Sequence, residues 1–506
     1  MLRQMICMLP ESLCSELGTL LPAIMTPASV GVARGILRNA AALFLVGAFA
    51  KGAGLIIAVL VARFLGADAM GLFAMLFSIA VLIETFISLG MSDSLVRDAA
   101  AHPSEAPQMY LAVLKLVGWI SIIPASCLAV AAIFVDEFAS ARSSLVILVV
   151  GTPISGAFIV AQSVLQGIER VLLLTWVTFL ARIVSLVLLF YAFHEGAGIE
   201  AAFASRVLFH LLSLAVFTFV LLRRREPRGA AHSARHLLTR AMPFAINRAI
   251  REVSNRLPSF VLPATMGLSG AGIFDSANRI RSSISMTMSA SVVGLMPAFA
   301  RNASEPEKDS GALIGYSVKY MCIGMSLIAT VVALLSEWII RLLFGSEFAA
   351  AALPLQLLTW TQVLNGIDAV LQQAMLARGV VAPAVRNSAI GVAAQLVLLL
   401  ALSVTLGLPG AALAVLLASG LTMAIDLRSL VSKVTPIPIR HFALAPLAAA
   451  FVVGCAMLAS HQFSIPIRGL IAVGSWAAVV ALFRVLPRDE LAFMWRLVAS
   501  GRARAV

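Results

Sequence analysis

Residues 242–266 have the length of a membrane span, yet they carry charges that a span in contact with lipid would not tolerate. Polar side chains interrupt the apolar run at Asn247, Arg248, Arg251, Glu252, Asn255 and Arg256. On an α-helix, residues four apart follow one line, so 247, 251 and 255 form one line and 248, 252 and 256 form the line beside it. An arginine near the middle of a bilayer costs about 2.5–3.5 kcal/mol, which a few leucines at about 0.5 kcal/mol each do not offset. The polar face is therefore expected to line water or protein; a helix lying on the membrane surface is the alternative.

A second polar stripe follows in residues 270–299, and a lysine stands in the middle of the first apolar segment. Asp275, Asn278 and Arg279 recur at the spacing of one helix face. Cations outnumber carboxylates in these segments, and guanidinium groups match the oxygens of a phosphate with two parallel hydrogen bonds. The sequence therefore predicts a cavity that binds an anionic phosphate or diphosphate headgroup through Lys51, Arg248, Arg251, Arg256 and Arg279. The expected polar lining of this cavity is Asn247, Glu252, Asn255, Asp275 and Asn278.

Motifs for other chemistry are not found in the sequence. It contains no Gly-x-x-x-x-Gly-Lys-Ser/Thr loop for nucleotide phosphates, no His-Glu-x-x-His and no Gly-x-Ser-x-Gly. The five cysteines show no Cys-x-x-Cys spacing. We therefore expect no catalytic residues, no metal site and no cofactor, and a transporter rather than an enzyme. Whether an ion or a proton drives the transport is left open by the sequence.

The composition is that of a protein embedded in a membrane through most of its length. Hydrophobic residues make up 61% of the 506 residues, charged residues only 12%, and the mean hydropathy is +0.99. A net charge of +13 would suggest nucleic acid as the partner of a soluble chain. Here the Lys and Arg residues gather in short loops between apolar runs, as in the cytoplasmic loops of membrane proteins. The sequence thus predicts an all-α integral membrane protein with membrane lipids, and not nucleic acid, around it.

Apolar runs of span length divide the chain into two halves around a basic linker. We expect about fourteen transmembrane helices, an even number that places both termini on the same side of the membrane. The excess of Lys and Arg in alternate loops indicates that this side is the cytoplasm. The expected organisation is a cytoplasmic N-terminal tail at 1–38, an N-lobe of helices 1–6 at 39–222, a basic cytoplasmic linker at 223–241, a C-lobe of helices 7–12 at 242–431, helices 13–14 at 432–486 and a cytoplasmic C-terminal tail at 487–506.

An internal repeat relates the two halves. LGADAMGLF at 65–73 matches MGLSGAGIF at 266–274, QSVLQG at 162–167 resembles QAMLARG at 373–379, and GAGIEAAFA at 196–204 resembles GLPGAALA at 407–414. Three matches in the same order indicate parallel copies of one six-helix unit. Such copies are related by a pseudo-two-fold axis along the membrane normal, and the substrate site lies between them. We therefore expect two pseudo-symmetric six-helix lobes around a central cavity, with two helices appended.

Several short motifs resemble those of one family of membrane proteins. ARFLGADAMGLF, LVRDAA, LQGIER, FGSEF and QQAMLARG follow one another in the order seen in the Wzx-type polysaccharide-export flippases of the MOP superfamily. The resemblance covers about residues 36–435. It implies a MATE-like fold in the bacterial inner membrane and the movement of undecaprenyl-diphosphate-linked oligosaccharide by alternating access. It also implies a role in O-antigen, exopolysaccharide or capsule biosynthesis, with a polysaccharide polymerase and co-polymerase as partners.

Two related functions remain as alternatives. A MATE-type drug or cation exporter would bind its substrate through acidic residues, which the arginines of residues 242–266 argue against. A lipid II flippase would share the cationic cavity, and the sequence separates it poorly from an oligosaccharide flippase. The glycan and the oligomeric state are not encoded in any pattern of the sequence.

Overall fold

The computed structural model describes residues 27–88, 91–134, 141–223, 234–293, 299 and 307–433, with isolated residues between 454 and 478. All elements in these ranges are helices, which confirms the all-α class. Eight of the described helices are long and apolar enough to cross a membrane. Helices suit such segments because every backbone N–H and C=O must find a partner within the segment when no water is present. The total of fourteen spans stays a prediction.

The N-terminal half consists of α3 to α8. Its helices are α3 (Pro27–Ser88), α4 (Met91–Ala101), α5 (Ala106–Phe134), α6 (Arg142–Gly167), α7 (Val171–His194) and α8 (Glu200–Leu222), with the short 3₁₀ turn η1 (Pro103–Glu105) before α5. The C-terminal half consists of α9 (Ala234–Val293), α11 (Glu307–Leu334), α12 (Ser336–Leu343), the 3₁₀ turn η3 (Ser346–Ala351), α13 (Ala352–Ala377) and α14 (Val381–Lys433).

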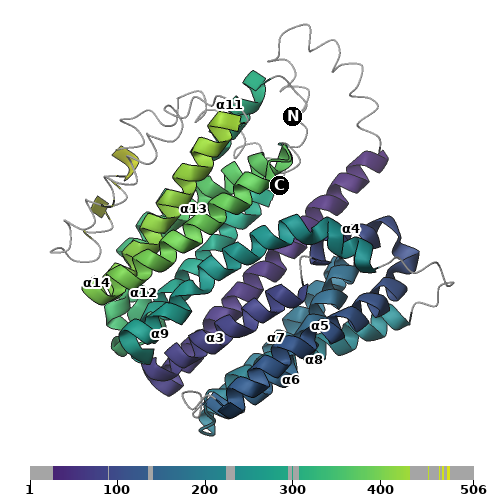
Figure 1. Cartoon of the computed structure of the whole chain (residues 1–506), viewed down its shortest axis with the longest axis horizontal. Helices are drawn as coiled ribbons and strands as arrows, with labels where there is room; N and C mark the ends of the chain where they lie inside the picture. The colour runs from purple at the N-terminus through teal and green to yellow at the C-terminus, as the bar shows by residue number, and fades with distance from the viewer. Residues whose placement is uncertain are drawn as a thin grey trace, which may run out of the picture.

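The helices of both halves run along one common direction (Figure 1). Helix α4 lies at one end of this bundle and α12 at the other, and we call these the α4 end and the α12 end. Helices α3 and α9 pack against each other at the junction of the two halves. One buried cluster of side chains, with Phe73 of α3, Phe274 of α9 and Leu355 of α13 among its members, joins the halves there.

Helices α3, α9 and α14 are each two helices joined at a glycine. Gly66, Gly267 and Gly407 have φ angles of 81°, 74° and 64°, values that side chains with a Cβ rarely adopt. Gly66 and Gly267 occupy equivalent places in the first sequence repeat. Each bend returns the chain through the bundle, so one long helical segment supplies two neighbouring helices.

The other two repeats also coincide with left-handed residues. Glu169 (φ 59°) lies two residues after the matched QSVLQG segment, and Gly379 (φ 74°) is the last residue of QAMLARG. Gly196 (φ 85°) and Gly407 begin the third matched pair. At Glu169 and Gly379 the same pair of backbone hydrogen bonds closes the helix, as in a Schellman motif. The sequence repeat therefore marks equivalent helix junctions in the two halves.

The expected tail and linker boundaries differ from the observed helix ends. Helix α3 already begins at Pro27 and α9 at Ala234, so helices extend into the segments 1–38 and 223–241. A helix does not need to end where its apolar segment ends, because polar residues continue it in water. Most of helices 13–14 at 432–486, and the C-terminal tail at 487–506, lie outside the described residues.

Candidate functional site

The two bent helices cross through glycine at the α12 end. A Cβ atom on Gly71 would lie 2.0 Å from the carbonyl oxygen of Leu268, and a Cβ atom on Gly272 would lie 2.1 Å from that of Ala67. The two clashes are equivalent under the pseudo-two-fold rotation, since Ala67 and Leu268 occupy the same position in the two repeats. Small residues let helix backbones approach this closely in a membrane. The pseudo-two-fold axis therefore passes between Gly71 and Gly272, and the halves are closed against each other at this end.

A reciprocal clamp adds to this closure. Arg63 of α3 donates through Nε to the carbonyl oxygen of Leu343 (2.9 Å) and through Nη2 to that of Leu342, at the C-terminal end of α12. Glu347 of η3 accepts a hydrogen bond from the backbone N–H of Ala67 (3.1 Å), where the second part of α3 begins. A cation at a helix C-terminus and a carboxylate at a helix N-terminus are both favourable placements. Arg63 belongs to the motif ARFLGADAMGLF and Glu347 to the motif FGSEF, so these two motifs supply the side chains that join the halves at this end.

Replacing Glu347 by alanine is expected to loosen this end. A side chain that caps a helix N-terminus contributes about 1 kcal/mol, so the population with separated halves should rise about fivefold. Spin labels on Asp68 and Ser346, both exposed, would report this as a larger long-distance fraction. Glu337→Ala is the matched control, because the partner of Glu337 in the described part of the chain is Arg341 of its own helix. Equal distance distributions for the two variants would contradict the clamp.

A cavity of about 680 Å³ occupies the α4 end. Its wall consists of the end of α3, α4, the end of α6 and the first part of α9, with the charged residues Glu84, Arg97, Arg248 and Glu252 and several Ser, Thr and Gln side chains. A volume of this size fits a drug-sized ligand or the headgroup of a lipid. The molecule is thus open to the α4 end and closed at the α12 end.

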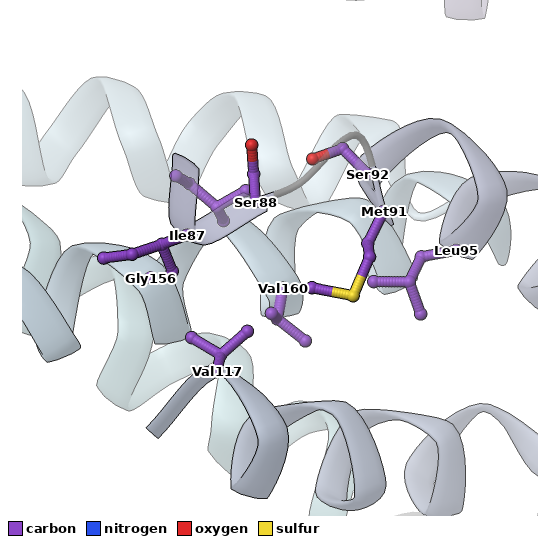
Figure 2. Close-up of a pocket in the computed structure, with 9 residues that line it drawn as sticks. Ile87, Ser88, Met91, Ser92, Leu95, Val117, Gly156 and Val160 are labelled. Atoms are coloured by element: carbon purple, nitrogen blue, oxygen red, sulfur yellow. The ribbon is translucent and has the colours of Figure 1, made fainter. Parts of the chain in front are cut away.

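A much smaller hollow lies beside this cavity, behind the junction of α3 and α4 (Figure 2). Its volume is about 10 Å³, and side chains such as Ile87, Met91, Leu95 and Val160 surround it. Gly156 forms part of its wall because a Cβ atom there would come within 2.7 Å of Val117. The hollow has room for at most one water molecule, so we regard it as a packing gap.

The two lines of polar residues on α9 face different surroundings. Of the line 248, 252 and 256, Arg248 and Glu252 line the cavity, and Arg256 is not among its lining residues. Asn247, on the other line, is 7% exposed and accepts a hydrogen bond from Ser388 of α14 (3.1 Å). Arg251 donates to Asp368 of α13 (3.1 Å). The line 247 and 251 therefore turns towards α13 and α14, away from the expected lining position, because these helices supply polar partners.

Besides Arg251, two more of the expected binding arginines already have carboxylate partners. Arg256 pairs with Glu252 (2.8 Å) and Arg279 with Asp275 (2.6 Å), in both cases four residues back on the same helix. These pairs leave N–H groups for a ligand but contribute little net charge. Asn255 of the same helix is exposed.

No carboxylate among the described residues pairs with Lys51, Arg248 or Arg281. Lys51 and Arg248 are exposed. Arg281 is only 7% exposed, and its Nε donates to Asn278 Oδ1 (2.8 Å). The charges of Arg256, Glu252, Arg279 and Arg281 all act on Lys51, so α3 and α9 present their cations to one region. Arg281 was not among the residues expected from the sequence, although it has no Asp or Glu three or four residues away to neutralise it.

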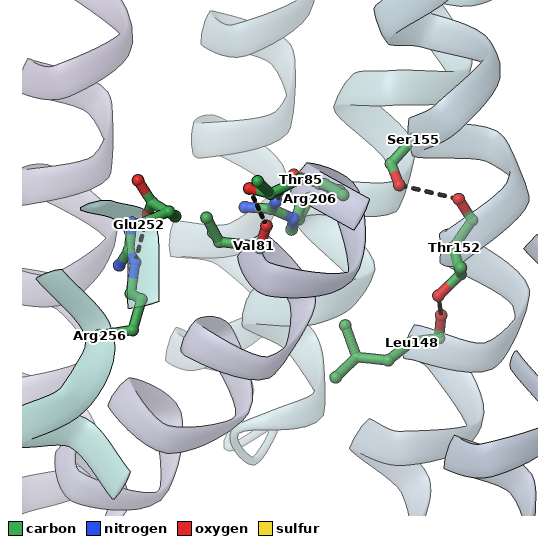
Figure 3. A network of polar contacts seen from close by, with 9 residues as sticks. Val81, Thr85, Leu148, Thr152, Ser155, Arg206, Glu252 and Arg256 are labelled. Atoms are coloured by element: carbon green, nitrogen blue, oxygen red, sulfur yellow. Dashed lines mark hydrogen bonds and ion pairs between the residues drawn. The ribbon is translucent and has the colours of Figure 1, made fainter. Parts of the chain in front are cut away.

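An aromatic ring brings cations of both halves together. The ring centre of Phe77 lies 4.8 Å from the guanidinium carbon of Arg206, 5.4 Å from that of Arg256 and 4.9 Å from that of Arg279. The negative face of the ring offsets part of the repulsion between them. Figure 3 shows the Arg256–Glu252 ion pair and Arg206 in one view with Val81 and Thr85 of α3.

A carboxylate of the N-terminal half completes the charged set around α3. Glu84 accepts a hydrogen bond from Arg206 of α8 (2.6 Å), and both side chains are 17% exposed. Arg182 of α7 stacks on the ring of Phe209, 3.4 Å from its centre. Glu84 thus lines the cavity already paired, which leaves little negative charge there to attract a cation. Within the described residues, no three His, Cys, Asp or Glu side chains gather as they would around a metal ion.

The fold and these charges define a class of protein before any relative is considered. That class is a helical membrane protein with two repeat-related halves, a wide cavity at one end and a tight crossing at the other. Solved structures support the fold. That of the lipid II flippase MurJ, in an inward closed conformation, aligns with 87% of this chain and 98% of its own, at a TM-score of 0.67 and 15% identity.

Two further structures of the superfamily align over most of the chain. A MOP superfamily transporter from Pyrococcus furiosus gives a TM-score of 0.61 at 16% identity, covering 79% of this chain and 96% of its own. An inward-facing multidrug resistance MATE transporter gives 0.60 at 16% identity, covering 74% and 92%. No curated protein sequence matches significantly. The family model described as polysaccharide biosynthesis protein matches residues 36–303, and the chain belongs to this family.

Proposed function

We propose that this protein is a flippase that moves undecaprenyl-diphosphate-linked oligosaccharide from the cytoplasmic to the periplasmic leaflet of the bacterial inner membrane. The observation that carries the proposal is a set of cations without a carboxylate partner among the described residues: Arg248 lines the large cavity, and Lys51 and Arg281 are charged neighbours of the Arg256–Glu252 pair. A diphosphate supplies the negative charges that this region lacks. Each charge-assisted hydrogen bond from an arginine to a phosphate oxygen contributes about 1.5–3 kcal/mol.

The walls of the cavity suit the other parts of such a lipid. Glycans bind through many hydroxyl groups, and Thr85, Ser163, Gln162 and Gln166 provide matching donors and acceptors. The polyprenyl chain has no polar group and stays in the lipid. The proposed cycle is alternating access: the α4 end loads the headgroup, the glycine crossing at the α12 end opens, and the headgroup leaves there.

Orientation, location and partners belong to the same proposal. The positive loops favour cytoplasmic termini, and the α4 end then faces the cytoplasm, where lipid-linked oligosaccharides are assembled. The product would be used for O-antigen, exopolysaccharide or capsule biosynthesis, and a polysaccharide polymerase and co-polymerase would receive it. The family to which the chain belongs supports this role in polysaccharide biosynthesis.

Two other functions compete with this proposal. A lipid II flippase would carry the same diphosphate group, and the alignment with the lipid II flippase MurJ is compatible with this function. A MATE-type cation exporter would need unpaired carboxylates in the cavity. Glu84, Glu252 and Asp275 are instead all paired with arginine, which favours an anionic substrate.

The test is a comparison of three ligands on the purified full-length protein. Undecaprenyl diphosphate is expected to raise the melting temperature, because it binds the folded state, whereas undecaprenol has no phosphate and should not. A lipophilic cationic dye is the third ligand. Stabilisation by the dye and not by the diphosphate would overturn the proposal and favour the cation exporter. Two diphosphate lipids separate the remaining functions, one carrying the lipid II disaccharide-peptide and one carrying a plain oligosaccharide. Far tighter binding of the first would favour a lipid II flippase.

A further inference from the structure

A buried polar network fills the interior of the C-terminal half, where α9, α13 and α14 meet. Its centre is Asp426 of α14, which is fully buried. Both carboxylate oxygens have a donor: Asn387 Nδ2 lies 2.8 Å from Oδ1 and Gln372 Nε2 lies 2.9 Å from Oδ2. Two amide donors stabilise the ionised form of a carboxylate. Asp426 is therefore a satisfied negative charge inside the protein.

Asp368 of α13 is also buried, but only one of its two carboxylate oxygens has a hydrogen-bond donor within the described residues. Its side chain is 5% exposed, and its Oδ2 accepts the hydrogen bond from Arg251 Nη1. Its Oδ1 is buried and has no hydrogen-bond partner within the described part of the chain. The negative charge of Asp426 also acts on it. Asp368 thus has one arginine as its cation, a second carboxylate nearby, and one buried oxygen without a donor, which is an unfavourable arrangement for an ionised group.

Arg251 stands between this network and the cavity. Its side chain is 36% exposed, although its partner is almost completely buried. The residues next to it in its helical turn, Arg248 and Glu252, line the cavity. The Arg251 side chain is thus bound to the buried carboxylate and is still partly exposed, one residue away from the cavity wall.

We propose that Asp368 is a proton-binding site linked to the substrate through Arg251. When the phosphate of a substrate enters, the Arg251 guanidinium turns from Asp368 Oδ2 to a phosphate oxygen and keeps its charge. The Asp368 carboxylate, left beside Asp426, takes one proton from water and becomes a neutral carboxylic acid. The reverse steps return the proton when the substrate leaves. This inference rests on the proposed anionic substrate and adds to it a proton that binds together with the lipid.

The charged groups packed around Asp368 are consistent with one exchangeable proton. Arg251 comes from α9 and Asp426 from α14. Lys319 of α11, which also packs against α13, lies over the rings of Tyr316 and Tyr320 on its own helix. Once Arg251 leaves, the described network offers Asp368 a neighbouring negative charge and no replacement cation. Protonation then removes the repulsion and supplies a donor inside the network.

The direction of the pH dependence follows from the proton count. The substrate-bound state holds one more proton than the free state, so binding takes up a proton and the affinity rises as the pH falls. For one linked proton the change is at most about tenfold per pH unit. The phosphate of the substrate itself titrates in every measurement. The contribution of Asp368 is therefore the difference in the pH dependence of affinity between wild type and a variant.

The experiment measures the affinity of the full-length protein in detergent for undecaprenyl diphosphate over a range of pH. Wild type is expected to bind more tightly as the pH falls. Asp368→Asn, whose side chain is always neutral, should show the low-pH affinity throughout. Arg251→Ala should bind about 10- to 100-fold more weakly and lose the same part of the pH dependence. Glu337→Gln, which neutralises a surface ion pair, should behave as wild type.

Equal pH dependence in wild type and Asp368→Asn would overturn the proton site and leave the anionic substrate intact. A second measurement needs no ligand. Infrared spectra of the apo protein should show the band of a buried protonated carboxyl group at low pH in wild type and not in Asp368→Asn. If the diphosphate fails to bind at all, the proposed function falls, and the infrared band still decides the site: its appearance supports a proton on Asp368, and its absence at every pH rejects it.

Discussion

A leucine at position 272 is expected to abolish transport and to hold the halves apart at the α12 end. Even a Cβ atom at this position would lie 2.1 Å from the carbonyl oxygen of Ala67 and 2.8 Å from the backbone nitrogen of Gly71. Real Cβ atoms do not come so close to backbone atoms, and no rotamer relieves the clash. The helices must therefore separate, and a state that requires their contact becomes inaccessible. A leucine at Gly71 should have the same effect, because the crossing is symmetric.

A buried side chain at the crossing reports the separation. Met70 is fully buried, so a cysteine there, in a chain without the native cysteines, should be protected from a soluble thiol reagent. With Gly272→Leu the same cysteine should react. Gly118→Leu is the matched control, since a Cβ atom on this helical glycine meets no atom within 4 Å. Continued protection of position 70 together with normal transport would show that the crossing tolerates side chains and is not the closed gate.

Much of the fold could be predicted from the sequence because glycine residues mark the positions where the long helices bend. Gly66 and Gly267 fall within the strongest repeat match, and only glycine adopts their left-handed backbone without strain. What the pattern could not show is that the next glycines of the repeat, Gly71 and Gly272, touch each other. A repeat predicts that two copies are alike, not how they pack together. That contact depends on the tertiary structure of both halves.

The candidate site was predicted less completely, since periodicity places residues on a face but does not say what the face meets. The two polar lines of 242–266 exist as expected. Which of them faces the cavity was decided by Asp368, more than a hundred positions away along the chain, which attracts Arg251. Arg281 was not predicted as a site residue because it lies outside the stripe of Asp275, Asn278 and Arg279. Its lack of a carboxylate one helical turn away was a usable signal, since Arg256 and Arg279 both have one.

Arg281→Ala is expected to weaken binding of undecaprenyl diphosphate by about 10- to 100-fold and, in the same variant, to leave stability unchanged or higher. The two effects have one cause. A buried cation without a carboxylate partner among the described residues is a cost to the folded state, and its removal relieves that cost. A residue kept only for structure would give the opposite result, with a lower melting temperature and unaltered binding. When an anionic ligand binds, its negative charge pairs with Arg281, so the free energy that the unpaired cation costs the folded protein is recovered as binding free energy.

Arg428→Ala provides the matched comparison. It also removes one positive charge from the C-terminal half, but from an exposed position on α14, so neither binding nor stability should change much. Lys51→Ala should weaken binding as Arg281→Ala does, because the two cations act on the same region from α3 and α9. Thermal unfolding with and without the diphosphate measures both quantities on one sample. If Arg281→Ala binds the diphosphate as tightly as wild type, the buried charge does not serve the headgroup, and the anionic site must be sought around Lys51 and Arg248 alone.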